Sequence, residues 1–301
     1  MTTFQNIPVA QATTSSIIEK YGLDFRISKH PMVAIDKGGN QIVSPFFGLI
    51  NERTGEVINT CKAGYTVSQN EDVIDLVLKG IQQFQGDLSV SKAGSIHGGR
   101  RVFLQLALNG LTKIGNDSIV RYITVIDSND GSTSLSIGIG DMAMHCQNQF
   151  FKFYKAGDSK FRHTASLEKR IQEIPRLIDN ALNESMRQVA TYNRFLSTPL
   201  TKQLADKMVN AVLGNDRSMS IAEQAKLSTR SINMMDTLYA NIERETSEVG
   251  NNVWGLFNGL TRYTTHEIKG PSRDFGGDES LIVGNGYKKG IAGFKFLEAA
   301  I

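Results

Sequence analysis

Cysteine is scarce in this 301-residue chain, which has only two, Cys61 and Cys146. Two cysteines are too few for a disulfide framework, and these two do not form a metal-ligand spacing. We interpret each as a small buried hydrophobic residue and not as a reactive thiol.

Long apolar runs are absent as well. No stretch approaches the roughly 20 consecutive residues that a membrane-spanning helix needs. Residues 1–16 have neither the basic start nor the apolar segment of a secretory signal. These absences predict a cytoplasmic protein that does not bind membranes. The formal net charge is only +3, so any affinity for polyanions has to come from local clusters of basic residues.

Sequence signatures of an enzyme are also missing. The five histidines never occur as His-x-His or His-x3-His, and no acidic residue stands beside one at a metal-ligand spacing. Residues Gly98–Arg100 lack the continuation of a phosphate-binding loop, and Gly138 and Gly140 lack the full dinucleotide-binding pattern. We therefore expect a protein that is not an enzyme and that needs no cofactor or metal.

The pattern of residues changes along the chain. Residues 1–20 are rich in Thr, Ser and Gln without periodicity, which predicts a flexible arm. Residues 21–150 contain short β-type runs and one helix that begins near Asn70. Residues 151–301 begin with a basic linker and continue as a helical region. This order predicts an α+β fold: a curved, mostly antiparallel β sheet with an embedded helix, followed by a mainly helical C-terminal half.

Three glycine-containing turns are expected between the strands of the sheet. They are His97–Gly99, Asn109–Gly110 and Asn129–Gly131. The last one follows Asp127 and resembles the start of a calcium-binding loop, but the glycine and glutamate of the sixth and twelfth positions are missing. We interpret it as a hairpin turn in which Gly131 adopts a positive φ and Asn129 or Asp130 bonds the local backbone.

Capping residues predict the helices of the second half. Ser166 is expected to begin a helix that reaches Ile178 with a kink at Pro175, and Ser220 with Glu223 forms a capping box for another. A further helix is expected near Asn252 and a short one at the end of the chain.

Two polar stretches leave alternatives open. His145 and Cys146 are expected on a short helix, where adjacent side chains point about 100° apart and form a poor catalytic dyad. Asn258, Arg262 and His266 recur every four residues on the helix that carries Trp254. Their stripe is either a site or an exposed polar face.

Positive charge is concentrated in residues 152–176, where seven Lys or Arg residues accompany three acidic residues and interleaved aromatics. Cations contact phosphates and aromatic rings stack on bases, which is what a single-strand binder needs. A second basic group surrounds the His97–Gly99 turn. The alternative is a solvated charged face with the aromatic residues in the core. The candidate nucleic-acid-binding residues are Lys92, Arg100, Arg101, Lys152, Tyr154, Lys155, Lys160, Arg162, His163 and Arg170, with Phe151 as a second candidate for base stacking.

Several segments together resemble one protein family. "GYTVSQNEDVIDLV", "AGSIHGGRRVFLQLAL", "VIDSNDGSTSLSIGIGDMAMHCQNQF", "FRHTASLEKRI" and "NNVWGLFNGLTRYTTH" occur in the order and approximate spacing of the phage- and plasmid-encoded DUF932 proteins. The resemblance implies a mobile-element protein in a bacterial cytoplasm, and it implies no activity. In architecture alone, the predicted order is similar to phage single-strand annealing proteins of the RecT and Erf type, which assemble into rings or filaments on DNA.

These observations favour a single-stranded DNA-binding protein of a phage or mobile element, acting as a homo-oligomeric annealing recombinase. One alternative is a non-enzymatic regulator that binds a host defence or replication protein. A second alternative is a metal-dependent nuclease that uses His145, His163, Asp127 or Asp130.

Overall fold

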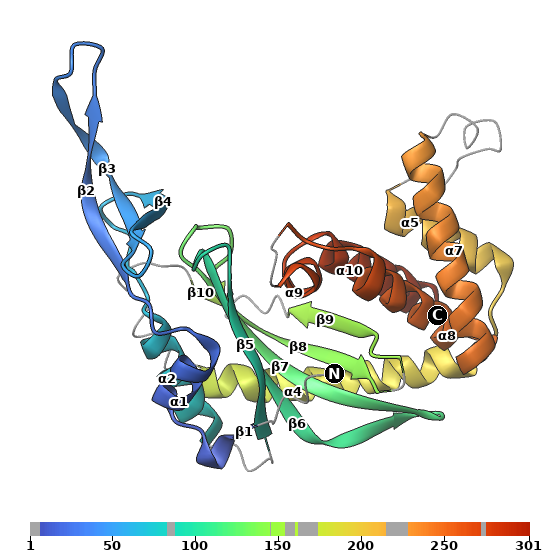
Figure 1. Cartoon of the computed structure of the whole chain (residues 1–301). Helices are drawn as coiled ribbons and strands as arrows, with labels where there is room; N and C mark the ends of the chain where they lie inside the picture. Colours follow the sequence, from blue (N-terminus) through green and yellow to red (C-terminus); the bar gives the residue numbers. More distant parts are fainter. Residues whose placement is uncertain are drawn as a thin grey trace. The chain divides into compact units, whose positions relative to one another are not determined.

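The computed structural model describes residues 7–82, 88–144, 146–153, 160–161, 174–214, 228–271 and 275–301 (Figure 1). Within these residues the fold is α+β, as the sequence predicts, because strands dominate the first half and helices the second. No described helix has the length and apolar character to cross a membrane.

The described strands form two antiparallel sheets. The larger sheet has the order β1-β5-β6-β7-β8-β10, with β9 also paired to β8, and the smaller has the order β2-β3-β4. The strands are β1 (Ile7–Pro8), β2 (Ile27–Ile35), β3 (Gln41–Asn51), β4 (Glu56–Cys61), β5 (Leu88–Ile96), β6 (Arg101–Ile114), β7 (Asp117–Ser128), β8 (Leu135–Ala143), β9 (Gln149–Phe153) and β10 (Lys160–Phe161).

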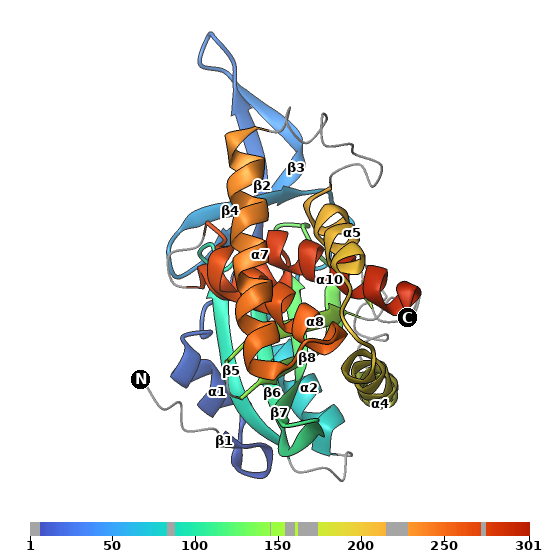
Figure 2. The same ribbon diagram turned by 90° about the vertical axis from the view of Figure 1, so that its right-hand side faces the viewer.

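Most described helices follow the strands in the sequence. Two short ones precede or interrupt the strands, α1 (Thr14–Tyr21) and α2 (Asn70–Gln82). The C-terminal half contains α4 (Ile174–Ser197), α5 (Lys202–Leu213), α7 (Thr229–Val249), α8 (Val253–Arg262), α9 (Gly276–Ile282) and α10 (Asn285–Ala300). Helix α10 packs against α5 and α8, and α7 packs against α8 (Figure 2).

The chain forms two compact units that interleave along the sequence. Unit 1 comprises Met1–Asn109, Tyr122–Ile139 and Phe153–Leu182, and unit 2 comprises Gly110–Arg121, Gly140–Lys152 and Asn183–Ile301. The sequence predicts boundaries after residues 20 and 150 instead, because the composition changes there. The difference arises because β6, β7 and β8 each contribute residues to both units.

The core of unit 1 lies between α2 and one face of the larger sheet. Val73 and Val77 of α2, which repeat at the predicted helical spacing, are buried in one apolar cluster with Leu104 of β6 and Val125 of β7. This confirms that the predicted helix is embedded against the sheet. Strand alternation places the remaining residues of β6 and β7 on the opposite face.

The core of unit 2 is an aromatic cluster. Phe294 of α10 is fully buried, and its ring centroid lies 5.0 Å from that of Phe150, 5.7 Å from Phe257 and 6.0 Å from Phe195. Trp254, the only tryptophan, is 2% exposed in the same cluster, so its helix contributes to the core of the unit.

The prediction of a flexible N-terminal arm is wrong for residues 7–20. Thr13 and Ser16 form a reciprocal cap at the start of α1, with Thr13 Oγ1 accepting from the Ser16 amide at 3.1 Å. Ile17 is fully buried and Val9 is 7% exposed, both in the core of unit 1. The polar residues that suggested an arm are helix-capping residues around a few buried apolar ones.

Other local predictions also differ from the structure. Asn109 and Gly110 lie inside β6 and not in a turn, because β6 continues to Ile114 and the chain reverses at Gly115, where φ is 57°. Cys146 lies in a turn and not on a helix, and His145 is outside the described residues, as are Ser166, Ser220 and Glu223. Pro175 is the second residue of the described part of α4, and the helix predicted to precede it lies outside the described residues, so the kink at Pro175 stays a prediction.

Replacing Phe294 tests the aromatic core. Phe294→Ala is expected to lower the free energy of unfolding by about 3–5 kcal/mol, since it removes a buried ring and leaves a cavity. Met186→Ala is the control, because Met186 is 64% exposed on α4 of the same unit and its loss is expected to change stability by about 0.5 kcal/mol or less. Chemical denaturation followed by circular dichroism measures both variants, and equal midpoints would contradict this assignment of the core.

Candidate nucleic-acid interface

The structure places four of the ten candidate residues with their side chains: Lys92, Arg100, Arg101 and Lys152. The backbone of Lys160 is described in β10, but its side chain is not. The others, Tyr154, Lys155, Arg162, His163 and Arg170, lie outside the described residues.

Lys92 and Arg101 lie on the same face of the larger sheet. Lys92 of β5 stands opposite Gln105 of β6, and Arg101 of β6 stands opposite Ile96 of β5. Four residues separate these two pairs along each strand, which corresponds to about 13 Å. Sequence spacing alone does not reveal this shared face, because it depends on the register of two strands.

Arg100 ends the turn that joins β5 to β6. Three consecutive residues of this turn have positive φ: His97 at 54°, Gly98 at 66° and Gly99 at 95°. The Asn51 side-chain amide donates to the Gly98 carbonyl at 2.8 Å. A Cβ at Gly99 would lie 2.6 Å from the Phe25 ring, so the turn packs closely against Phe25 at this point. The backbone that carries Arg100 is therefore held in one conformation.

The loop between β7 and β8 is hydrogen-bonded to the turn that carries Arg100. The Asn129 amide donates to the Arg100 carbonyl at 2.8 Å, and Asn129 Nδ2 donates to the Gly99 carbonyl at 3.5 Å. Within the loop, Asp130 Oδ1 accepts from the Ser132 amide at 2.9 Å, and Gly131 has a φ of 70°. Both features confirm the predicted hairpin turn.

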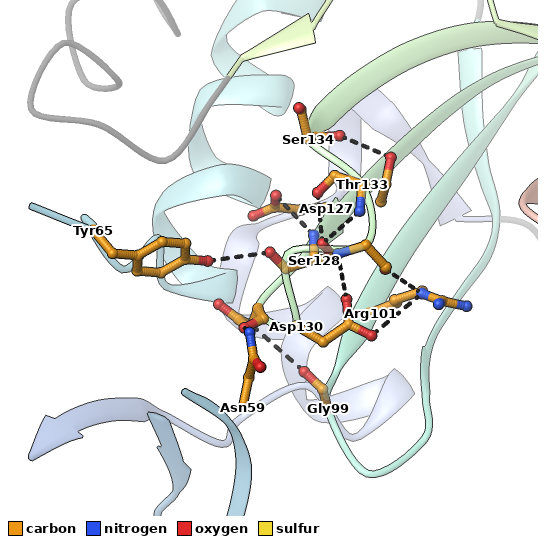
Figure 3. Close-up of polar contacts among 11 residues, drawn as sticks. Asn59, Tyr65, Gly99, Arg101, Asp127, Ser128, Asp130, Thr133 and Ser134 are labelled. Carbon is orange, nitrogen blue, oxygen red and sulfur yellow. Dashed lines mark hydrogen bonds and ion pairs between the residues drawn. The ribbon is translucent and has the colours of Figure 1, made fainter. Parts of the chain in front are cut away.

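Asp127 stabilises this loop through hydrogen bonds to its carboxylate. Its Oδ2 accepts from Ser68 Oγ at 2.5 Å and its Oδ1 accepts from the Ser128 amide at 2.9 Å. Tyr65 donates its hydroxyl to the Ser128 carbonyl at 3.4 Å (Figure 3). Burial and the charge of Asp127 raise the pKa of Tyr65, so the hydroxyl remains a donor at neutral pH. These bonds explain why so many polar residues gather in a segment without catalytic spacing.

The two arginines of the turn differ in their partners. Arg101 donates to Ser132 Oγ at 2.7 Å and forms an ion pair with Asp130 at 3.6 Å, so Asp130 offsets part of its charge (Figure 3). Arg100 is exposed and forms no ion pair with any residue that the structure describes. Arg100 is thus the residue whose full charge faces solvent, whereas Arg101 also holds the loop.

The basic segment that follows β9 returns to the same part of unit 1. Strand β10 pairs antiparallel with β8, with Lys160 opposite Ser136 and Phe161 opposite Leu135. Leu135 directly follows the loop whose Asn129 bonds the Arg100 turn. Strand β10 of the second basic segment and the Arg100 turn of the first therefore both adjoin the loop after β7.

The role of Phe151 in base stacking is contradicted. Phe151 is 3% exposed, and its ring lies against Gly140, where an added Cβ would be 2.2 Å from the ring. Its burial depends on a glycine in a neighbouring strand, which alternation along its own strand does not show. Lys152 lies in unit 2, with Nζ 4.7 Å from the centroid of the Phe294 ring.

The polar stripe begins on α8 and ends at the exposed His266 beyond it, and its first two residues have partners inside the protein. Asn258 is 2% exposed, Arg262 donates to the buried Glu245 at 3.3 Å, and His266 contacts Asn148 at 3.2 Å. Burial and the nearby Arg262 lower the pKa of His266, which favours its neutral form. Burial raises the pKa of Cys146 to about 11, so this thiol is protonated at neutral pH. Among the described residues, no group of three or more His, Cys, Asp or Glu is arranged to hold a metal.

Sequence reasoning missed a second buried network in unit 2. Arg121 Nε donates to Asp141 Oδ1 at 2.9 Å, and Gln188 and Tyr192 donate to Asp141 Oδ2 at 2.8 and 2.9 Å. Arg121 and Asp141 are 8% and 4% exposed, so their charges are mutually compensated and serve the packing of α4 on the strands. The signal available in the sequence was a charged residue within an otherwise apolar strand: Arg121 in β7 and Asp141 in β8.

With this geometry established, comparison with protein families gives one match. A family model described as "Domain of unknown function (DUF932)" matches residues 57–281. The chain belongs to the DUF932 family. The match runs from β4 to α9 and includes both the Arg100 turn and the loop after β7. It confirms the predicted family, whereas the similarity to RecT and Erf proteins stays a prediction. Comparison with curated proteins and comparison with solved structures found no match.

Substitution of Gly99 tests how tightly the turn is held. Gly99→Ala is expected to cost about 1–2 kcal/mol for the positive φ and about 1–3 kcal/mol more for the overlap with Phe25. Gly39→Ala is the matched control, since Gly39 has a φ of 81° but no atom within 4 Å of an added Cβ. Thermal or chemical unfolding compares the two variants. If both lost the same stability, the close packing of the turn would be refuted.

Proposed function

We propose that this DUF932 protein binds single-stranded DNA and promotes the pairing of complementary strands, as a homo-oligomer and without a cofactor. The observation that best supports the proposal is that the Arg100 turn and β10, which lies in the second basic segment, both adjoin the loop after β7. The Arg100 turn is hydrogen-bonded to this loop, and β10 pairs with the strand that follows it.

Phosphate contacts account for the binding in this proposal. Arg100 presents an exposed guanidinium from a backbone that Asn51 and Asn129 hold, so little conformational entropy is lost when it binds. Lys92 lies on the same face of the larger sheet as Arg101. Further candidate cations come from the sequence around β10: Lys155, Lys160, Arg162 and Arg170. Tyr154 remains the candidate for base stacking.

Annealing in this proposal uses binding energy alone. Contacts to the phosphates leave the base edges free, so a second strand can pair with the bound one. The whole interaction is expected to weaken with salt, because each phosphate contact releases counterions. A complementary pair of labelled oligonucleotides, followed by energy transfer, measures whether the protein accelerates pairing.

The metal-dependent nuclease gains no support. Asp127 accepts hydrogen bonds from Ser68 and Ser128, and Asp130 is engaged by Arg101 and Ser132. Both carboxylates thus have structural partners in the loop. The other alternative, a regulator that binds a host defence or replication protein, stays a prediction.

Charge reversal at Arg100 tests the proposed interface. Arg100→Glu is expected to weaken binding of a labelled single-stranded oligonucleotide at least about tenfold at low salt. It is also expected to reduce the salt slope of log K by about 0.7 for each lost phosphate contact. Fluorescence anisotropy over a salt series measures both quantities.

The control for that experiment is Arg230→Glu. Arg230 is an exposed residue at the start of α7 in unit 2, and its reversal changes the net charge equally. Binding by Arg230→Glu is expected to stay close to that of the unmodified protein. Equal losses in both variants would mean that only the net charge matters and would rule out the Arg100 turn as the interface.

A further inference from the structure

Among the residues that the structure describes, the end of the hairpin formed by β2 and β3 has no third strand. Strand β4 pairs with Phe47–Asn51 of β3, and the distal parts of β2 and β3 pair with each other. Figure 1 shows this two-stranded ribbon continuing well beyond the end of β4. An isolated two-stranded ribbon is marginally stable in water, so its distal part gains from any partner that covers it.

Large apolar side chains on this distal ribbon are exposed. Their exposed fractions are 50% for Val33, 70% for Ile35, 53% for Ile42, 80% for Val43 and 44% for Phe46. Val33 stands opposite Val43, and Ala34 stands opposite Ile42. Since successive side chains alternate between faces, both faces of the ribbon are apolar.

The free edges of the ribbon are suited to strand pairing. Backbone groups on the outer edges of β2 and of the distal β3 have no partner strand among the described residues. Pro31 and Pro45 interrupt these edges only near the base of the ribbon. The pairing of β2 with β3 is irregular between Pro31 and Val33, and beyond that point the apolar edge is a template for another strand.

The charges of the ribbon do not suit a phosphate backbone. At the tip, Lys37 is balanced by Asp36, whose pKa is lowered by hydrogen bonds from Asn40 and from nearby backbone amides. Asp36 therefore stays ionised, and the tip carries one positive and one negative charge. Two such ribbons can approach each other without net repulsion.

We propose that the distal β2–β3 ribbon is a self-association surface whose occupant is the same ribbon of a second copy of this chain. The five exposed side chains present on the order of 500 Å² of apolar surface, at the upper end of what a monomer usually exposes. Two ribbons that pair along one edge and pack through one face cover part of this surface in each copy, which corresponds to an interface at the small end of the size range, supplemented by backbone hydrogen bonds between the edges. A two-fold contact of this kind needs only one self-complementary surface.

This surface lies apart in sequence from the proposed DNA interface, and its test needs no DNA. The double variant Ile35→Lys/Val43→Lys places two charges on the exposed ribbon, where neither residue supports a core. The mass of the unmodified protein, measured by light scattering and sedimentation at micromolar concentration, is expected to be at least that of a dimer. The double variant is expected to dissociate at least about 100-fold more readily, about tenfold for each charge.

The matched control is Leu111→Lys/Ile232→Lys. These residues are 54% and 43% exposed, and they lie on β6 and α7 of unit 2, away from the ribbon in sequence. The control adds the same charge and is expected to retain the mass of the unmodified protein. Circular dichroism of both double variants verifies that each is folded.

Cysteine cross-linking locates the contact. A Val43→Cys variant is expected to form a disulfide-linked dimer under mild oxidation, whereas a Leu111→Cys variant is not. The proposal is overturned if the unmodified protein is a monomer, if the ribbon variant keeps its mass, or if only the Leu111→Cys variant cross-links. Arg100→Glu is expected to lower DNA binding without changing the mass, so failure of one proposal is distinguishable from failure of the other.

Discussion

The hydrogen bond from the Asn129 amide to the Arg100 carbonyl connects the parts of unit 1 on which the functional proposal depends. It joins the β5–β6 turn to the loop after β7, and that loop leads directly into the strand that pairs with β10. Hydrogen bonds stabilise this loop: Ser68 donates to Asp127, and Tyr65 donates to the Ser128 carbonyl. Because all of these groups are bonded, the loop can present charge from a fixed backbone, which reduces the entropy lost on binding.

The sheet and its helix provide the support for this arrangement. One face of the sheet is buried against α2, and Lys92 and Arg101 lie on the other. Strands β6, β7 and β8 also continue into unit 2, where an aromatic cluster forms a separate core. The proposed DNA interface and the proposed self-association ribbon both belong to unit 1 but use different residues.

Sequence patterns among neighbouring residues were sufficient to predict much of the fold. The spacing of Val73 and Val77 identifies α2, and Asn252 is the N-cap of α8, as predicted. Predictions failed where distant residues decide the outcome. Asn109 and Gly110 have strong turn propensity, yet pairing with β5 begins opposite Leu108 and β6 simply continues past them. The polar segment before Tyr21 folds because Ile17 finds a core contributed by later strands.

For the candidate site too, local features could be predicted from the sequence, whereas features that depend on distant residues could not. The basic and glycine-rich character of residues 97–101 is visible in the sequence, but the different roles of Arg100 and Arg101 depend on Asp130 and Ser132, some 30 residues later. The burial of Phe151 depends on Gly140. The exposed ribbon was also not predicted, because its alternating apolar residues are typical of a strand with a covered face.

The most direct test of the central claim is photo-cross-linking of the protein to a single-stranded oligonucleotide that carries photoreactive bases, followed by mass spectrometry of the linked peptides. If the two basic clusters form one interface, linked peptides will come from both residues 92–101 and residues 152–170. Links confined to one of these segments, or located mainly on α7 or α10, would contradict a shared interface at the loop after β7.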